Sequence, residues 1–166
     1  MGIAIDKEKF IEIIKSNKGI LYKIINSYCR DIIDRKDLEQ EILIQIWKSL
    51  KNYNGDVKIS TWIFKVATNV AISFYRTGIK HKNATTLYEN YVFQFTEIEI
   101  ENNLLETNSE LLYKTINLLD EFNKAIIILY LEEYNYKEIA EIIGITETNV
   151  ATKINRIKKI LKENLS

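Results

Sequence analysis

Apolar residues recur every three or four positions along most of this chain, and the chain contains no proline. An α-helix brings positions three and four apart onto one face, whereas a half-buried strand alternates apolar and polar residues. The pattern therefore predicts helices rather than strands. The predicted helices cover about residues 6–30, 35–50 and 60–78 in the first half, and about 110–119, 121–133, 136–143 and 146–164 in the second half. We accordingly predict an all-α fold.

The helical period is lost between residues 78 and 109, and the charge changes in the same region. Residues 83–109 contain five glutamates and no lysine or arginine, whereas residues 1–82 contain fifteen Lys and Arg against nine Asp and Glu. Residues 144–166 are again basic, with five against two. This asymmetry indicates segments with different partners, although the net charge of the whole chain is zero. We expect two small helical domains, residues 1–82 and 110–166, joined by a flexible acidic linker, residues 83–109.

The chain is poor in residues that carry chemistry. Cys29 is the only cysteine and His81 the only histidine, so one chain cannot form a disulfide or the four-ligand Cys/His site of a structural zinc. Nothing near His81 suggests the base of a nucleophilic triad, and no glycine-rich phosphate-binding motif is present. We therefore expect no enzymatic activity, no metal, no cofactor and no small-molecule substrate.

The composition also favours a particular compartment. Hydrophobic residues make up 46% of the chain and charged residues 28%, which is the balance of a soluble globular protein. The longest apolar runs, such as residues 126–131, are too short to cross a bilayer, and no charged-then-apolar leader opens the chain. We therefore expect a cytoplasmic protein.

The end of the chain has the spacing of a helix-turn-helix, a motif whose second helix enters the DNA major groove. Ala140 permits two helices to approach closely, and Gly144 permits a turn between them. Asn135 with Glu138 predicts a capping box at the start of the first helix, and Thr146 is a suitable N-cap for the second. The same spacing also fits a plain helical hairpin, which remains the alternative.

The second helix of this motif is predicted to have two distinct faces. Four apolar residues at steps of four, three and four form an inward stripe: Val150, Ile154, Ile157 and Leu161. Polar and basic residues are expected on the other side: Asn149, Thr152, Lys153, Arg156 and Lys159. Side chains of these types can bind base edges and phosphates, so the pattern favours DNA binding over an ordinary solvated face.

Short groups in the first half follow one another in a characteristic order. They are Asp37-Leu38-Glu39-Gln40-Glu41, the turn Tyr53-Asn54-Gly55-Asp56, the pair Thr61-Trp62 and the triplet Asn69-Val70-Ala71. With the run from Tyr136 to Ile145, they make the chain resemble the extracytoplasmic-function sigma factors in both the order and the spacing of the motifs. The resemblance implies an alternative sigma factor, which binds RNA polymerase core and directs it to a promoter.

The resemblance also implies a division of labour. We assign the binding of polymerase core, at the clamp helices of its largest subunit, to Asp37, Leu38, Gln40 and Glu41. We assign the minus-ten element, read as single strand, to Tyr53, Asn54, Asp56, Lys58, Lys65, Asn69 and Arg76. We assign the minus-thirty-five duplex to Thr148, Asn149, Thr152, Lys153 and Arg156. Promoter DNA and polymerase core are thus the expected partners, and an anti-sigma factor is a further candidate because many members of the family have one.

Helix geometry is compatible with the polymerase assignment. Asp37, Gln40 and Glu41 fall on one side of a helix, where two carboxylates and an amide can pair with Arg and Lys of a partner. The same helix has an apolar stripe at steps of four: Leu38, Ile42, Ile46 and Leu50. For the short motif taken alone, an ordinary solvated face is the alternative.

The turn after this helix is a candidate for reading bases. The residues from Tyr53 to Lys58 are mostly polar and lie near aromatic side chains, so they can enclose an extruded base by edge hydrogen bonds and stacking. An ordinary interhelical turn remains the alternative. Trp47 and Trp62 fall beside the inward stripes, so we interpret both as core residues rather than stacking platforms.

Two other functions are also compatible with the sequence. A helix-turn-helix regulator that never engages polymerase would account for residues 110–166 but would leave the groups of the first half unexplained. A polymerase-binding anti-initiator would need the first domain without promoter specificity. Binding to core polymerase separates the regulator from the other two, and promoter-specific transcription separates the sigma factor from the anti-initiator.

Overall fold

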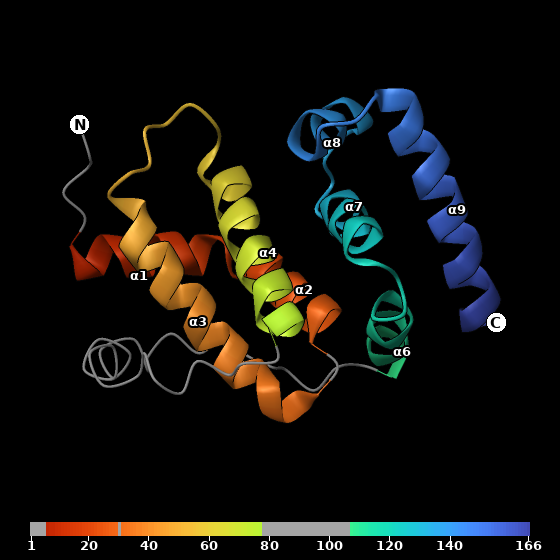
Figure 1. Cartoon of the computed structure of the whole chain (residues 1–166), viewed down its shortest axis with the longest axis horizontal. Coiled ribbons are helices and arrows are strands. Elements are labelled where there is room, and N and C mark those ends of the chain that lie inside the picture. Colours follow the sequence, from red (N-terminus) through yellow and green to blue (C-terminus); the bar gives the residue numbers. More distant parts are fainter. Residues whose placement is uncertain (1–5, 30, 78–106) are drawn as a thin grey trace. The chain divides into compact units, whose positions relative to one another are not determined.

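A computed structural model describes residues 6–29, 31–77 and 107–166 of the chain (Figure 1). In these residues every regular element is a helix, which confirms the all-α prediction. The helices are α1 (Lys7–Ser16), α2 (Lys18–Tyr28), α3 (Ile32–Leu50), α4 (Ile59–Thr77), α6 (Thr107–Ile116), α7 (Glu121–Leu131), α8 (Tyr136–Ile143) and α9 (Glu147–Leu165). His81 and nearly all of the predicted acidic linker lie outside the described residues.

The described chain divides into two compact units. The first unit contains residues 6–25 and 31–77, and the second contains residues 26–29 and 107–166. None of the helices in these stretches is long and apolar enough to cross a membrane.

The single helix predicted over residues 6–30 is wrong in one respect, because the chain forms two helices that meet at Asn17. The Asn17 amide nitrogen donates to the Ile13 carbonyl (2.8 Å), and its backbone N–H donates to the Ile14 carbonyl (3.1 Å). Asparagine competes in this way with the regular helical ladder, and Gly19 just beyond adds a second poor helix former. Both features were visible in the sequence.

The first unit is built around the packing of α3 against α4, with α1 and the start of α2 completing its core. The ring of Phe10 on α1 meets that of Trp47 on α3 edge to face, with 5.0 Å between centroids. Its largest fully buried side chains come from all four helices: Phe10, Ile14, Leu21, Ile24, Leu38, Ile42, Ile46, Leu50 and Ile63. The stripe predicted for α3 is therefore confirmed as core.

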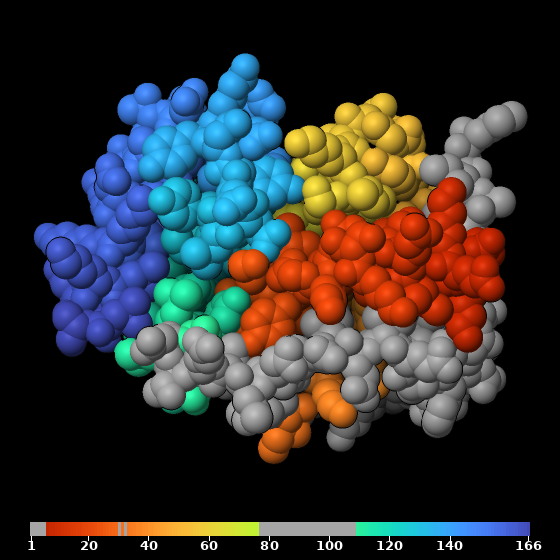
Figure 2. All heavy atoms as spheres, turned by 180° about the vertical axis from the view of Figure 1, so that it is seen from behind, coloured from red at the N-terminus to blue at the C-terminus, as the bar shows by residue number. Residues whose placement is uncertain are grey.

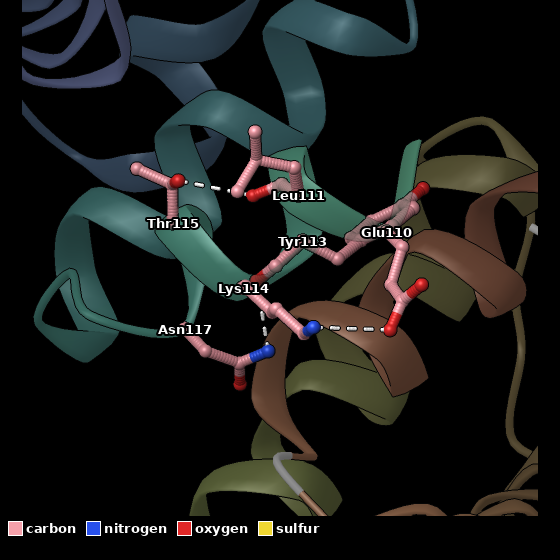
Figure 3. Close-up of polar contacts among 6 residues, drawn as sticks. All are labelled: Glu110, Leu111, Tyr113, Lys114, Thr115 and Asn117. Atoms are coloured by element: carbon pink, nitrogen blue, oxygen red, sulfur yellow. Dashed lines mark hydrogen bonds and ion pairs between the residues drawn. The ribbon is translucent and has the colours of Figure 1, made fainter. Parts of the chain in front are cut away.

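The second unit encloses its core with α6, α7, α8 and α9. Ile116 of α6, Ile126 of α7 and Ile139 of α8 are fully buried. On α6, Thr115 Oγ1 donates to the Leu111 carbonyl at 3.0 Å (Figure 3). The exposed Lys114 also pairs with Glu110 across 3.1 Å. An exposed i,i+4 pair stabilises a helix by only about 0.3–0.5 kcal/mol, so the apolar core holds this unit together.

The end of α6 is fixed by a buried amide. Asn117 Nδ2 donates to the Tyr113 carbonyl at 2.9 Å, at the last turn of the helix (Figure 3). The same nitrogen donates to the backbone carbonyl of Asn26 at 2.9 Å, within the second unit. The amide nitrogen of Asn117 can thus donate both of its N–H groups to backbone carbonyls, which satisfies it as a buried donor.

Candidate polymerase-binding and DNA-binding surfaces

The helix-turn-helix of the second unit is capped at each of the predicted positions. Asn135 and Glu138 form the capping box, each accepting a backbone N–H of the other at 2.9 Å. Gly144 ends α8 with φ of +85° and donates its N–H to the Ala140 carbonyl at 2.8 Å. Thr146 Oγ1 accepts the Asn149 N–H at 3.1 Å and starts α9. Caps of this kind are each worth about 0.5–2 kcal/mol, so the turn is strongly specified.

The two faces predicted for α9 are present. The stripe of Val150, Ile154, Ile157 and Leu161 is buried. Four of the five residues assigned to DNA are exposed: Thr148, Asn149, Thr152 and Arg156. The Thr152 hydroxyl donates to the Thr148 carbonyl at 3.1 Å, which leaves its methyl group and lone pairs toward solvent. Thr152 can therefore accept a hydrogen bond or touch a methyl group but has no free proton to donate.

The fifth residue, Lys153, has a different position. It is half-buried at the edge of α9, and its ammonium lies 5.1 Å from the ring centroid of Phe122 on α7. We expected it on the face opposite the core, together with Arg156. Helix geometry explains the difference, because Lys153 lies three positions after the buried Val150 and four before the buried Ile157. The Phe122 ring then attracts its cation.

The opposite edge of α9 has a matching basic residue that the sequence did not single out. The Lys158 ammonium lies 4.5 Å from the ring centroid of Tyr130 on α7. The Tyr130 hydroxyl, acting as a hydrogen-bond partner, raises the pKa of Lys158 and so favours its cationic form further. The outer face of α9 is thus polar, with one aromatic-bound lysine at each edge.

On α3, the residues assigned to polymerase fall into three environments. Asp37 and Gln40 are exposed, Glu41 is half-buried, and Leu38 is fully buried. Leu38 therefore has no surface with which to touch a partner, and its place in the motif is that of a core residue. Ile33 lies on the same side of α3 as Asp37 and is 78% exposed. The outer face of α3 thus combines an acid, an amide and an unusually exposed apolar side chain.

A groove between α3 and α4 joins residues from two of the assigned sites. Its cavity has a volume of about 360 Å³ and is lined by Glu41, Gln45, Ser49, Val66, Asn69, Val70, Ser73 and Phe74. Gln45 Nε2 donates to Ser49 Oγ at 3.0 Å along one wall. Glu41, assigned to polymerase, and Asn69, assigned to the minus-ten strand, therefore face the same groove. The sequence motifs gave no indication of this, because it depends on how α3 packs against α4.

The three residues assigned to DNA on α4 form one line. Lys65, Asn69 and Arg76 are exposed and fall within about one tenth of a turn of each other around the helix axis. They extend for about 16 Å along that axis at the rise of an α-helix. Lys58, just before the helix, is also exposed. Cations in a line of this length suit a run of nucleic-acid phosphates.

The loop between α3 and α4, residues 51–58, lies at the surface of the first unit (Figure 2). Gly55 has φ of +83°, in the left-handed region that favours glycine. Asn54 Nδ2 donates to Asp56 Oδ2 at 2.6 Å, and the Asp56 N–H donates to Asn54 Oδ1 at 3.1 Å. Tyr53 is half-buried, with its ring centroid 5.5 Å from that of Trp62. The turn chemistry predicted for Asn, Gly and Asp is confirmed.

Comparison with known sequence families identifies both halves of the chain. The family Sigma-70 region 2 matches residues 13–78, which include the groove between α3 and α4. The family Sigma-70, region 4 matches residues 109–161, which include the helix-turn-helix. The two regions occur in the order that the motifs of the sequence predicted.

Individual relatives agree with this result. The ECF RNA polymerase sigma factor SigW of Bacillus subtilis is 24% identical, over 96% of this chain and 90% of its own length. The ECF RNA polymerase sigma factor SigM of the same species is 27% identical, over 91% of each chain. The solved structure of the sigma factor RpoE with the anti-sigma factor NepR, from Bartonella quintana, has the same fold, with a TM-score of 0.64, 17% identity, and 96% of this chain and 95% of that chain covered. The chain therefore belongs to the extracytoplasmic-function class of RNA polymerase sigma factors.

Proposed function

We propose that this alternative sigma factor uses three separate surfaces to direct transcription initiation. The outer face of α3 binds polymerase core, the loop after α3 together with α4 binds the minus-ten element, and α9 binds the minus-thirty-five element. The observation that carries this proposal is the occurrence, on one chain, of a region 2 unit and a capped region 4 helix-turn-helix. A regulator that never engages polymerase is not favoured, because it would have no use for region 2.

For polymerase, the proposed contact is the side of α3 that displays Asp37, Gln40 and Ile33. A carboxylate and an amide can form charge-assisted hydrogen bonds with Arg or Lys of a partner helix. Ile33 adds apolar area that is otherwise left in water. Glu41 contributes from the groove wall, where lower solvent exposure strengthens its interactions with a cation.

For the minus-ten element, the proposed contacts are the line of Lys65, Asn69 and Arg76 and the surface loop before α4. The two cations hold phosphates of the separated strand, which gives affinity without sequence preference. The polar groups of Asn54 and Asp56 supply the base-edge hydrogen bonds, and hence the preference. In this scheme α4 positions the strand and the loop selects it.

For the minus-thirty-five element, α9 enters the major groove by its first turns. Asn149 and Thr152 lie in that part and are proposed to meet base edges, whereas Arg156 lies one turn later. Lys153 and Lys158 stand at the two edges of the helix, where the phosphates that border a groove are expected. Their aromatic neighbours fix them there and reduce the entropy that binding would cost.

The regulation and the cellular location of the chain are also proposed. An anti-sigma factor is a proposed regulator of this chain, supported by the complex of the related fold with NepR. The chain is proposed to act in the cytoplasm, where polymerase and chromosomal DNA are found, and to work by binding alone, without an enzymatic reaction of its own.

Reconstitution with core polymerase tests this proposal. Copurification of the chain with core, followed by specific transcription from a promoter, is the expected result. A chain that binds DNA but never core would be a regulator of another kind. A chain that binds core but yields no specific transcript would be an anti-initiator.

A further inference from the structure

Tyr53 makes two contacts that close the loop between α3 and α4. Its hydroxyl donates a hydrogen bond to the backbone carbonyl of Val57, at the far end of the loop. Its ring packs at 52° against that of Trp62, with 5.5 Å between centroids. Tyr53 therefore ties the start of the loop both to its end and to the first turns of α4.

A second set of bonds fixes the exposed tip of the same loop. Asn54 and Asp56 bond to each other through both side-chain and backbone groups, and Gly55 between them has φ of +83°. The Asn54 amide donates one N–H to Asp56, whose carboxylate accepts it at one of its two oxygens. One amide N–H and one carboxylate oxygen remain for another partner. The tip thus offers one donor and one acceptor on a backbone that is already ordered.

We infer that Tyr53 is a positioning residue for minus-ten recognition, which holds the loop in its reading conformation and does not itself stack on a base. The inference rests on the proposed function of this loop. Tyr53 is half-buried, with its ring packed at a tilt against Trp62 and its hydroxyl bonded to the Val57 carbonyl, whereas Asn54 and Asp56 are exposed. An ordered loop avoids the entropy that a flexible loop would lose on binding the strand.

The two roles of Tyr53 are separated by removing its hydroxyl alone. Tyr53→Phe keeps an aromatic ring for stacking but loses the hydrogen bond to the Val57 carbonyl, and Tyr53→Leu loses both. The measurement is the affinity of reconstituted holoenzyme for a single-stranded oligonucleotide that carries the minus-ten sequence. If Tyr53 positions the loop, Tyr53→Phe should weaken binding of the oligonucleotide about three- to tenfold, which is the effect of one net hydrogen bond. Tyr53→Leu should weaken it at least as much. Wild-type affinity for Tyr53→Phe together with a loss for Tyr53→Leu would assign stacking to the ring and overturn the inference.

Abasic oligonucleotides provide a readout that a general loss of stability would not change. The abasic position is moved stepwise through the minus-ten sequence. When the abasic position is the one that the loop reads, Tyr53→Phe and wild type should bind the oligonucleotide with equal affinity. The reason is that the base which the ordered loop would contact is no longer there. A Tyr53→Phe defect that persists at every abasic position would mean that the hydroxyl serves stability only, and the inference would be wrong.

The wild-type holoenzyme separates failure of this inference from failure of the proposed function. If wild type binds core but has no affinity for the minus-ten strand, the proposed role of the loop fails, and the inference fails with it. If wild type binds the strand and only the response of Tyr53→Phe is absent, the proposed function stands and the positioning role alone is rejected. Core affinity, measured for each variant, should be unchanged in both cases.

Discussion

Charge reversal at Asp37 gives a quantitative test of polymerase docking. Asp37 is exposed on the outer face of α3, and an ion pair that stays in water at the rim of the interface sets the smallest effect to expect. An exposed pair contributes about 0.2–1 kcal/mol, and reversal replaces this attraction with a repulsion of similar size. The Asp37→Lys variant should therefore lose about 0.4–2 kcal/mol of binding free energy, or about two- to thirtyfold in affinity for core.

The control for this prediction is the neighbouring Lys36, which is also exposed but points away from the face of Asp37 by about a quarter of a turn. Lys36→Glu reverses a charge on the same helix and should leave core affinity within about twofold of wild type. Both variants should unfold within about 0.5 kcal/mol of wild type, because both positions lie on the surface. Affinities are measured by titration of labelled protein with core at low and high salt, and the defect of Asp37→Lys should shrink with salt. Equal core affinity for both variants at low salt would refute the docking surface.

Three further predictions address the two DNA surfaces and the core beneath α9. Asp56→Asn keeps an acceptor for the Asn54 amide but removes the negative charge. Promoter libraries selected with this variant should therefore show an altered minus-ten preference, while its affinity for core is unchanged. If the minus-ten preference were also unchanged, the loop would be an ordinary turn that reads no base. Arg156→Ala should cost about 1–3 kcal/mol on one sequence if Arg156 reads a base, or weaken all sequences alike and lower the salt slope by about one unit if it holds a phosphate. Undiminished transcription on a template that needs its upstream element would exclude both roles. Ile154 is fully buried on α9, so Ile154→Ala should lower the free energy of unfolding of the second unit by about 2–5 kcal/mol. Ile154→Val should lower it by about 0.5–1.5 kcal/mol. Equal losses for the two variants in denaturant melts would contradict the burial of this side chain.

Features that depend on a few neighbouring residues could be predicted from the sequence. The capping box of Asn135 and Glu138, the left-handed Gly144 and the N-cap Thr146 each involve bonds across three or four positions. Such bonds form whenever the residue types and the spacing are right, whatever the rest of the chain does. The break at Asn17 belongs to the same class, and its local signal was outweighed by the apolar period that continues through it.

Features that depend on the packing of separate helices could not be predicted in this way. The contact of the Lys153 ammonium with the ring of Phe122 on α7 is one such feature, although the position of Lys153 beside the buried stripe follows from helix geometry and was predicted wrongly. Glu41 and Asn69 share a groove only because α3 lies along α4. For Leu38, the apolar period predicted a core residue, whereas the resemblance to the sigma factors implied a contact with polymerase. Its complete burial agrees with the apolar period.

Promoter recognition by this chain is tested most directly by mapping the transcripts that reconstituted holoenzyme makes from fragments of the source genome. With wild-type chain, we expect new start sites preceded by shared elements near minus ten and minus thirty-five, absent with core alone. The variant Asp37→Lys should reduce all of these transcripts together, because it acts on core binding and not on sequence choice. Start sites that share no upstream sequence, or that are the same with and without the chain, would contradict promoter recognition by this protein.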